Sequence, residues 1–501
     1  MYVCVIDYIL RFYPKIYLIM KSFTTYLNLN ITIKKAIFLI ACSLLMVSSV
    51  FSQEITPSKQ QWKKMQIIIN SVKQPTFSNK TYNIIAYGAQ PNSTFDNTDA
   101  IRKAIQECSK NGGGIVLVPK GKFFSRPIHL EDNVNFHLDK DAEILFSTNP
   151  KDYYPLVHTS FEGTELMNYS PLVYAYNKKN VAITGKGTLN GQASKENWWP
   201  WCSSEMYGWK KGTPSQQDPL NRVQLVDMAE KNIPVSERVF GEGHYLRPNF
   251  VEFFECKNVL IQGITIVNAP FWVIHPIKSE NLIVDGVTIN SHGPNNDGCD
   301  PEYSKNVIIK NCTFNTGDDC IAIKSGRDAD GRRVAMKSEN IIVQNCTMFD
   351  GHGGVTIGSE ISGGVSNVFV ENCKMNSPNL DVAIRLKTNS KRGALIENFY
   401  VRNIQIGQVK EAVLKVDMFY NVHGNQNGIF IPRIENIYLE NVKVENGGQY
   451  SILAKGYKES PIKNITFKNV KIKTVKQNYS LENVENLKLI KTYINEIKMK
   501  E

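Results

Sequence analysis

The chain has 501 residues, of which 42% are hydrophobic and 21% charged, a balance that excludes wholesale disorder and fibrous folds. Its formal net charge of +11 comes from scattered lysines and arginines, which argues against nucleic-acid binding but leaves room for a polyanionic substrate. Ten cysteines are too few for a disulfide scaffold in a chain of this length.

The first 52 residues have the pattern of a secretory leader. Two lysines precede a mostly apolar run over residues 36–50, which is too short to span a bilayer and is followed by small residues. We expect cleavage near Ser52, export to the periplasm or the extracellular space, and no membrane attachment of the mature form. The alternatives are an uncleaved anchor and, less favoured, a lipoprotein attached through Cys42. Residues 53–79 would form an N-terminal extension.

The first elements after the extension are a helix and several strands. Residues 98–110 have the periodicity of an amphipathic helix with Asp96 or Asn97 as N-cap, and three consecutive glycines end it. Residues 114–119 and 128–146 favour strands. Because the helix precedes a long series of strands, we expect it to cap their open end.

A repeated pattern then extends through most of the chain. Each copy has an asparagine, four residues with apolar side chains at the first and third positions, and a glycine or asparagine hinge. The nine copies begin at Asn180, Asn258, Asn281, Asn306, Asn340, Asn367, Asn398, Asn436 and Asn464. From Gly263 onward, the hinges are 23, 25, 34, 27, 31, 38 and 28 residues apart.

This repeat predicts an all-β solenoid of stacked parallel coils. Period-two alternation indicates short strands, and the hinge indicates a bend in the left-handed backbone conformation. A propeller, the alternative, needs blades of about forty residues joined by hairpins, which these intervals do not provide. We therefore expect one domain over residues 80–495. The tryptophan-rich segment 192–247 has no repeat and should form loops over one face.

One column of side chains describes the solenoid interior. The residues that follow eight consecutive hinges are Ile264, Val287, Cys312, Cys346, Cys373, Ile404, Val442 and Val470. Since cysteine alternates with isoleucine and valine, we expect a ladder of small apolar residues with buried thiols. A stacked disulfide is the geometric alternative. A metal site is disfavoured because the column has no histidine.

Acidic, basic and imidazole side chains gather on four consecutive predicted coils. Asp318 and His352 lie seven positions past the hinges of neighbouring coils, so they should be stacked. Asp297 lies on the preceding coil. The full set is Asp297, Asp318, Asp319, His352, Arg385 and Lys387. A single Asp-Asp pair would be explained by a turn, but the whole set on adjacent coils favours a site.

The chemistry of this set is that of glycoside hydrolysis. Carboxylates that repel one another raise at least one carboxyl pKa, which provides a proton donor near neutral pH. Hydrolysis of a glycosidic bond needs such an acid together with a carboxylate that activates water. Arginine and lysine nearby could hold the carboxylate of an anionic sugar.

Four short motifs, in order, resemble those of the family 28 glycoside hydrolases, the polygalacturonases of pectin breakdown. They are Asn295-Asn296-Asp297 in place of Asn-Thr-Asp, Gly317-Asp318-Asp319, Gly351-His352-Gly353, and Arg385-Leu386-Lys387 in place of Arg-Ile-Lys. The resemblance begins at Tyr82 and implies a right-handed parallel β-helix that hydrolyses α-1,4-galacturonosyl bonds with inversion. It implies no metal or other cofactor. The partner would be an anionic polysaccharide such as pectin, with no nucleic acid, and we expect a monomer.

The resemblance also assigns roles to residues. The general acid would be Asp318, with its protonation tuned by His352. Water would be activated by Asp297 and Asp319. Substrate contacts would come from Arg385 and Lys387, which bind the galacturonate carboxylate, and from Asn295 and Tyr420.

Three segments resemble loops that close one end of the cleft in exo-acting members. They are residues 325–333, whose glycine and aspartate content predicts a loop, residues 268–276, and the tryptophan-rich residues 192–209. Trp272 and His275 could line the site of the terminal sugar; alternatively, Trp272 packs against a coil and His275 is a histidine of a loop. We therefore expect release of single galacturonates from the non-reducing end.

Three alternatives remain at this stage. Within the same family, a rhamnogalacturonan or xylogalacturonan hydrolase would use the same set of residues. A pectate lyase shares the solenoid but commonly needs Ca²⁺ and gives a product that absorbs ultraviolet light. A non-catalytic β-helix carbohydrate-binding protein would have no reason to stack Asp318 with His352.

Overall fold

The computed structural model describes residues 57–421 and 428–500, so the expected leader over residues 1–52 lies outside the described residues. Helix α4 (Pro57–Ser71) lies in the expected extension. Contacts divide the chain into two units, residues 1–63 and 64–501, and the strands that the structure describes belong to the second. Among the described helices, none is both long and apolar enough to cross a bilayer.

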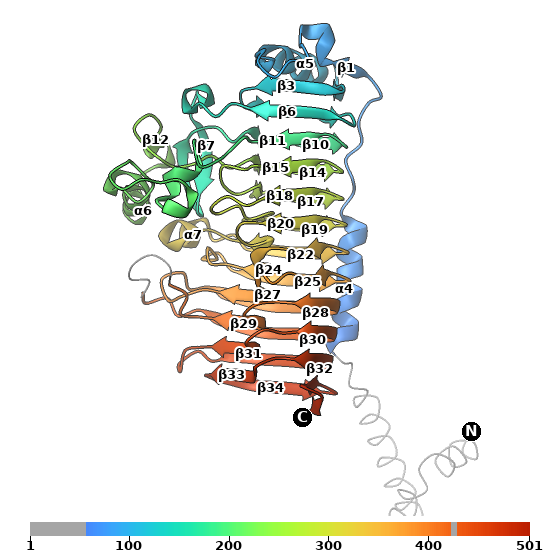
Figure 1. The fold of residues 1–501 in the computed structure, drawn as a ribbon, viewed down its shortest axis with the longest axis vertical. Helices are drawn as coiled ribbons and strands as arrows, with labels where there is room; N and C mark the ends of the chain where they lie inside the picture. The colour runs from blue at the N-terminus through green and yellow to red at the C-terminus, as the bar shows by residue number, and fades with distance from the viewer. Residues whose placement is uncertain (1–56, 422–427, 501) are drawn as a thin grey trace, which may run out of the picture. The chain divides into compact units, whose positions relative to one another are not determined.

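The second unit is a parallel β-helix, as the repeat predicts. Strands of successive coils pair in parallel and in register, so that Val307 lies beside Leu282 of the coil before and Ile341 of the coil after. Figure 1 shows the coils stacked in chain order, from β3 (Gly121–Ser125) near one end to β34 (Val484–Ile490) near the other. This parallel pairing excludes a propeller.

The largest sheet has 23 strands and contains the repeated pattern. Its other strands are β1 (Thr81–Asn83), β2 (Gly114–Val118), β5 (Val134–Leu138), β6 (Ala142–Phe146), β10 (Lys179–Gly185), β11 (Thr188–Asn190), β14 (Lys257–Gln262), β15 (Thr265–Val267), β17 (Glu280–Asp285), β18 (Thr288–Ser291), β19 (Lys305–Lys310), β20 (Thr313–Thr316), β22 (Ser338–Gln344), β23 (Thr347–Met348), β25 (Val365–Glu371), β26 (Lys374–Met375), β28 (Leu395–Gln408), β30 (Arg433–Asn446), β32 (Ile462–Thr474), β35 (Tyr493–Ile494) and β36 (Ile497–Lys498).

A second face of the coils consists of two shorter sheets. The first contains β4 (Ile128–His129), β9 (Val173–Tyr176), β13 (Val251–Phe254) and β16 (Ile274–Ile277). The second contains β21 (Ile321–Ile323), β24 (Gly351–Ile357), β27 (Leu380–Lys387), β29 (Ala412–Asp417), β31 (Tyr450–Lys455) and β33 (Gln477–Glu482). Only isolated bridges through Cys299 and Glu302 connect β16 to β21. The backbone is therefore irregular at the coil that carries Asp297.

The hinges have the predicted left-handed conformation. Asn311, Asn345 and Asn372 each have a φ of 56°, and Gly286 has a φ of 65°. Glycine has no Cβ to clash there, and asparagine tolerates this region better than most side chains, which explains the choice of residues. The first asparagine of each copy, for example Asn306 with a φ of 57°, is left-handed as well, which the repeat alone did not predict.

These asparagines form two hydrogen-bonded ladders along the stack. Asn306 Nδ2 donates to Asn281 Oδ1 at 3.3 Å, and Asn306 Oδ1 accepts from Asn340 Nδ2 at 3.0 Å. The hinges continue the same pattern, with 3.3 Å between Asn345 Nδ2 and Asn311 Oδ1. Each amide thus donates to one coil and accepts from the next, which satisfies both of its polar atoms.

The predicted interior column is confirmed. Cys312, Cys346 and Cys373 are each 1% exposed and lie in the main apolar core with Val287 and Ile404. All three thiols are free. Hydrogen bonds with the thiols above and below it, together with burial, raise the pKa of Cys346. These cysteines therefore behave as small core residues and not as reactive thiols.

The predicted capping helix is α5 (Thr98–Lys110). Asn97 is its N-cap residue, and the side chain of the preceding Asp96 accepts the Thr98 backbone N–H at 3.0 Å. Ile101 and Ile105 are each 1% exposed in the core cluster, and Figure 1 shows the helix at the end of the stack. The helix thus covers apolar side chains of the first coil.

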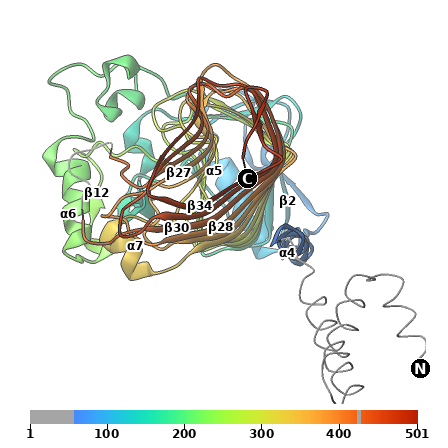
Figure 2. The same cartoon turned by 90° about the horizontal axis from the view of Figure 1, so that it is seen from below.

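Insertions between coils cover one side of the stack (Figures 1 and 2). They contain β7 (Val157–Phe161), β8 (Thr164–Asn168), β12 (Val239–Phe240), α6 (Gln224–Glu230) and α7 (Asp328–Val334). Short helical turns also occur, at Ile84–Tyr87, Pro150–Tyr153, Trp199–Cys202, Glu205–Tyr207, Pro219–Val223 and Val235–Glu237.

Two loop predictions were incomplete. Residues 192–247 contain α6 and several short turns, and residues 325–333 contain most of α7. The aspartates of α7, which together with glycine predicted a loop, are instead paired and buried. Asp330 forms an ion pair with Arg238, and Asp328 forms one with Arg392. These pairs from distant segments stabilise a helical turn that local sequence does not favour.

Candidate active site

A cavity of about 340 Å³ lies between the coils and the insertions. Its lining includes the coil residues Asn295, Asp297, Asp318, His352, Lys387 and Tyr420, together with Trp272. The insertions contribute Glu162, Tyr207, Arg222 and Arg327. Most residues of the predicted set therefore meet in one place, although they come from four coils.

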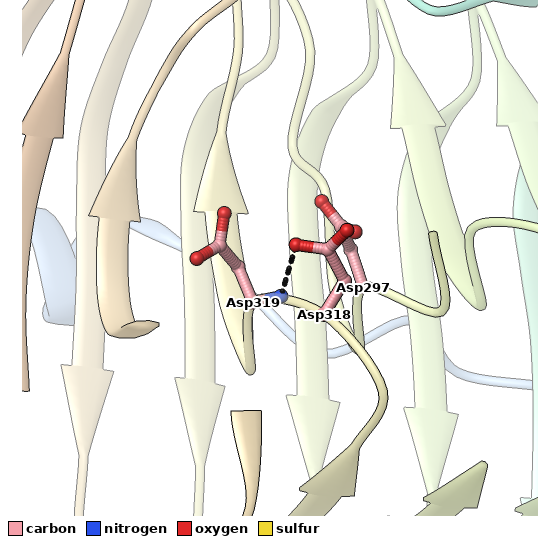
Figure 3. A group of neighbouring side chains, drawn as sticks. All are labelled: Asp297, Asp318 and Asp319. Carbon is pink, nitrogen blue, oxygen red and sulfur yellow. Dashed lines mark hydrogen bonds between the residues drawn. The ribbon is translucent and has the colours of Figure 1, made fainter. Parts of the chain in front are cut away.

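Three carboxylates are grouped at this site, of which Asp297 and Asp318 line the cavity (Figure 3). Oxygens of Asp297, Asp318 and Asp319 all lie within 4.8 Å of one another. Asp318 and Asp319 follow β20 in the turn before β21, and the Asp319 backbone N–H donates to Asp318 Oδ1 at 3.0 Å. Asp297 is 3% exposed and Asp319 is fully buried. Such close carboxylates cannot all be ionised without nearby positive charge.

The predicted stacking of Asp318 with His352 is present. His352 Nδ1 lies 2.9 Å from Asp318 Oδ1, and the His352 backbone N–H donates to the Asp318 carbonyl oxygen at 3.1 Å. The charge of Asp318 and this hydrogen bond raise the pKa of His352 to about 9. Burial by itself would raise the pKa of Asp318, but the imidazolium outweighs burial and lowers it. The pair therefore holds one proton between an imidazole and a carboxylate.

Asp297 differs from Asp318 in its electrostatic surroundings. Burial, followed by the charge of Asp318, raises the pKa of Asp297 to about 7, against the opposing effect of Lys324. Lys324 Nζ lies 3.2 Å from Asp297 Oδ2. The two carboxyls thus have pKa values displaced in opposite directions, so in the free protein Asp297 holds a proton more readily than Asp318.

Asp319 is held by both cations of the Arg-Leu-Lys motif. Lys387 Nζ lies 2.7 Å from Asp319 Oδ2 and Arg385 Nη1 lies 3.5 Å from Asp319 Oδ1. Thr356 Oγ1 donates to the same carboxylate at 2.9 Å. A Cβ at Gly353 would come within 2.7 Å of Asp319 Oδ1, so the Gly-His-Gly motif needs glycine there for space.

The other residues predicted to contact the substrate differ in whether they line the cavity. Tyr420 lines the cavity, with its ring centre 5.2 Å from Lys387 Nζ. Asn295 lines it too, and its Oδ1 accepts from Arg247 Nη2 at 2.7 Å. Trp272 reaches the cavity but is only 3% exposed. Arg385 does not line the cavity and lies behind Asp319.

The placement expected for His275 at the terminal-sugar site is wrong. His275 is fully buried, with Nε2 at 2.8 Å from Glu302 Oε2 and Nδ1 at 3.5 Å from Glu252 Oε2. His275 belongs to β16, which pairs in parallel with β13 so that His275 lies beside Glu252. An isolated histidine near a predicted loop carried no signal that two glutamates from adjacent coils would enclose it.

One side of the cavity is closed by residues that the sequence analysis did not identify. Glu162 Oε2 lies 2.5 Å from Arg222 Nε and 2.7 Å from Arg327 Nη1. Glu162 occupies the turn of the β7–β8 hairpin beside Gly163, where a Cβ would come within 2.9 Å of Glu360. The Gly163 carbonyl oxygen accepts from the Arg327 backbone N–H at 2.9 Å. The hairpin is thus tightly docked against the segment before α7.

The three carboxylates are also the only group within residues 57–421 and 428–500 whose geometry resembles a metal site. Two of them already contact ammonium groups, since Lys324 lies against Asp297 and Lys387 against Asp319. A divalent cation would have to share this small space with two positive charges, which disfavours it.

Comparisons with known proteins agree with this geometry. A family model described as glycosyl hydrolases family 28 matches residues 241–492. The structure of an exopolygalacturonase from Thermotoga maritima is 42% identical, with 88% of this chain and 97% of that chain covered and a TM-score of 0.84.

Two sequence relatives have related descriptions. A probable polygalacturonase of Vitis vinifera is 26% identical over 78% of this chain and 73% of its own length. An exo-poly-alpha-D-galacturonosidase of Dickeya chrysanthemi is 25% identical over 68% of this chain and 57% of its own length. From the matched family model and the extent of the structural likeness, the chain belongs to family 28 of the glycosyl hydrolases.

Proposed function

We propose that the protein is an exo-acting polygalacturonase, which hydrolyses α-1,4-galacturonosyl bonds and releases single galacturonates from the non-reducing end. The observation that carries this proposal is a cavity lined by Asp297, Asp318 and His352 from the coils and by the paired Glu162, Arg222 and Arg327 from the insertions. The descriptions of the relatives from Thermotoga maritima and Dickeya chrysanthemi support the substrate and the exo mode.

Cationic side chains suit the cavity to an anionic sugar. Lys387 and Tyr420 line it next to the carboxylates, and Arg327 and Arg392 line it as well. Charge-assisted hydrogen bonds to a sugar carboxylate are stronger than those to a neutral hydroxyl, so galacturonate would be preferred over its neutral counterpart. Arg385 lies behind Asp319 and would act by orienting the Asp319 carboxylate.

The proton for the leaving oxygen would come from the Asp318–His352 pair. In the free protein the proton rests on the imidazole, as the raised pKa of His352 indicates. Hydrogen bonding between Nδ1 and Oδ1 lets the proton pass to Asp318, which can then donate it to the glycosidic oxygen as the bond to C1 breaks. His352 is half exposed and can be reprotonated from solvent.

Water would be activated by Asp297 and Asp319. A water molecule held between these carboxylates would attack C1, and its proton would pass to the ionised Asp297. Asp319, which is paired with Lys387 and Arg385, would orient the water. One proton thus enters the leaving group from the acid and one leaves the water, so the net reaction is hydrolysis.

We expect inversion at the anomeric carbon, so that the first product is the β anomer. The oxygens of the three carboxylates lie within 4.8 Å of one another, whereas carboxyl groups in inverting glycosidases are generally about 6.5–9.5 Å apart. Because these carboxylates are close together, the attacking water would lie beside Asp297 and Asp319, and not between two carboxyl groups that are far apart. Proton NMR of the first-formed product tests this, and an initial α anomer would contradict inversion.

The product pattern tests the function itself. Polygalacturonate and rhamnogalacturonan are incubated separately with the protein, and the products are separated by size over time. We expect monogalacturonate to accumulate from the first time point, with polygalacturonate as the preferred substrate. Early oligomers of many lengths would contradict the exo mode, and an ultraviolet-absorbing product would indicate a lyase. Faster cleavage of rhamnogalacturonan would reassign the substrate.

We further propose that the mature protein is exported, monomeric and free of the membrane, with a single catalytic domain over residues 80–495. The basic and apolar pattern of residues 34–50 supports the leader. N-terminal sequencing of the exported protein should begin close to Gln53, and sedimentation should give the mass of one chain. An uncleaved N-terminus would contradict the leader, and a larger mass would contradict the monomer.

A further inference from the structure

Lys324 is a buried cation at the centre of the site that none of the assigned roles uses. It follows β21, and its backbone is fixed on both sides, with its N–H donating to the Pro301 carbonyl at 2.9 Å and its carbonyl accepting from Ser338 Oγ at 2.5 Å. Its side chain is 3% exposed yet lines the cavity. Burying an ammonium group is costly unless its surroundings compensate.

Three carboxylates and one aromatic ring surround the ammonium group. Lys324 Nζ lies 3.2 Å from Asp297, 3.4 Å from Asp300 and 3.4 Å from Glu360. The centre of the Trp272 ring is 4.3 Å away. Two of the three N–H donors of the ammonium group are hydrogen-bonded, to Asp297 Oδ2 and Glu360 Oε2, which fixes its direction, while Asp300 adds an ion pair without a hydrogen bond.

The carboxyl groups of Asp300 and Glu360 do not neutralise the positive charge of Lys324 completely. Burial, followed by the charge of Asp297, raises the pKa of Asp300 well above its ordinary value, which favours its neutral form. Glu360 is ionised, because Lys324, Arg392 and Arg327 outweigh burial and lower its pKa, but it divides its charge among these three cations. The positive charge of Lys324 therefore acts mainly to stabilise the ionised form of the Asp297 carboxylate.

We propose that Lys324 is a positioning residue that fixes the direction of the Asp297 carboxylate and keeps it ionised, so that it can accept the proton of the attacking water. This inference rests on the proposed hydrolysis. The groups that face Asp297 are Asp318 and Asp319 from the turn after β20, Lys324 after β21, Lys387 from β27, and Asp300 from its own segment. Among these, Lys324 and Lys387 are the cations, and Lys387 is committed to Asp319 at 2.7 Å.

The first test replaces Lys324 by a side chain of similar length without charge. In Lys324→Met, Asp297 loses its adjacent cation, so the acid limb of the kcat/KM profile should move to higher pH by about one unit or more. The fall in kcat/KM should be largest at low pH and smaller above the new limb. Lys178→Met is the control, because it removes a half-buried lysine that pairs with Glu131 outside the cavity.

The second test predicts a shift of opposite sign. In Glu360→Gln, an anion that competes for Lys324 is removed, so the acid limb should move to lower pH. This variant keeps the test decisive if Lys324→Met does not fold. An unmoved limb in either folded variant, or a loss of activity that is uniform with pH, as for a merely structural residue, would overturn the proposal.

A measurement without substrate separates this inference from the proposed function. Infrared absorption of protonated carboxyl groups is titrated in the free protein, and the band lost in Asp297→Asn identifies Asp297. In Lys324→Met this band should persist to higher pH than in the unsubstituted protein. A band with unchanged midpoint would overturn the role of Lys324. Failure of the unsubstituted protein to release galacturonate would instead contradict the proposed function.

Discussion

The two faces of the coils differ in the side chains that parallel register brings next to one another. On the ladder face, formed by Asn281, Asn306, Asn340 and the equivalent asparagines, neighbouring coils place the same side chain at the same position. On the cavity face, the aligned positions Thr356, Arg385 and Lys415 are all different. The ladder gains stability from repetition, whereas the cavity face has a different side chain at each level.

This difference has an energetic consequence. The ladder consists of neutral amides, each of which is satisfied by its neighbours at little cost of desolvation. The cavity buries Asp297, Asp319, Lys324 and Lys387, whose charges are costly to remove from water and are stable there only as a set. Substitutions should therefore affect activity on one face and stability on the other.

The largest effect is expected for Asp318→Asn. An amide cannot donate a proton to the leaving oxygen, so kcat should fall about 10²–10⁴-fold, the range for loss of general acid catalysis. Asp285→Asn is the matched control on the ladder side, where Asp285 accepts from Asn311 Nδ2 at 2.7 Å. Initial rates on polygalacturonate measure both. Comparable rates for Asp318→Asn and the unsubstituted protein would remove Asp318 from the mechanism.

A change of product pattern is expected for Glu162→Ala. Without Glu162, the guanidinium groups of Arg222 and Arg327 repel each other, and the docked hairpin should loosen. Longer chains could then pass the wall, so oligomers should appear beside monogalacturonate while the rate of bond cleavage changes less than tenfold. Glu196→Ala, at an exposed position, should leave the pattern unchanged. Release of monogalacturonate alone by Glu162→Ala would show that this wall does not set the exo mode.

A moderate loss of stability without loss of activity is expected for Asn306→Ala. The substitution removes two ladder hydrogen bonds and places alanine at a φ of 57°, which together should cost about 1–3 kcal/mol of unfolding free energy. Asn306→Gly keeps the backbone conformation and should lose less. Denaturant unfolding and initial rates distinguish the two faces. A similar loss in both variants would mean that backbone conformation contributes little.

The smallest effect is a pH dependence of stability due to His275. Burial lowers its pKa, but its contacts with the carboxylates of Glu252 and Glu302 outweigh burial and raise the pKa above 6.5. A raised pKa in the folded state means that the stabilisation is complete below about pH 6.5 and is lost as the pH rises through the folded value. The slope is at most about 1.4 kcal/mol per pH unit for one proton.

The test compares His275→Gln with the exposed control His292→Gln between pH 6 and pH 10. The free energy of unfolding of the control should decline with rising pH as in the unsubstituted protein, whereas that of His275→Gln should decline less. Equal slopes in the two variants would assign the alkaline loss of stability to other groups.

The sequence predicted the features that depend on periodicity. A strict interval between hinge and side chain places Asp318 under His352 and forms the cysteine column, because parallel strands in register transmit position from coil to coil. Arg385 and Lys387 were expected in the same group because they lie on an adjacent coil, but register did not predict their contact with Asp319. The asparagine ladders could have been predicted too, since the same residue recurs at one position of each repeat.

Features built from insertions could not be predicted in this way. Glu162 meets Arg222 and Arg327 only because three segments with no common period fold onto one side of the stack. The error at His275 has the same origin, since its partners lie on coils of different length. Lys324 carried a weak signal, because it follows a strand directly beside the carboxylates, but a lysine at a strand end is more often solvated.

The order of the cavity residues along the chain has a consequence for biosynthesis. Glu162, which closes the cavity, is translated well before Arg327, and Tyr420 comes later still. Coils of a solenoid can stack as soon as their neighbours exist, so the aspartates can be in place before Lys387 and Tyr420 have been added. An incomplete chain would thus have the fold without the chemistry, and hydrolysis would begin only when synthesis is nearly finished.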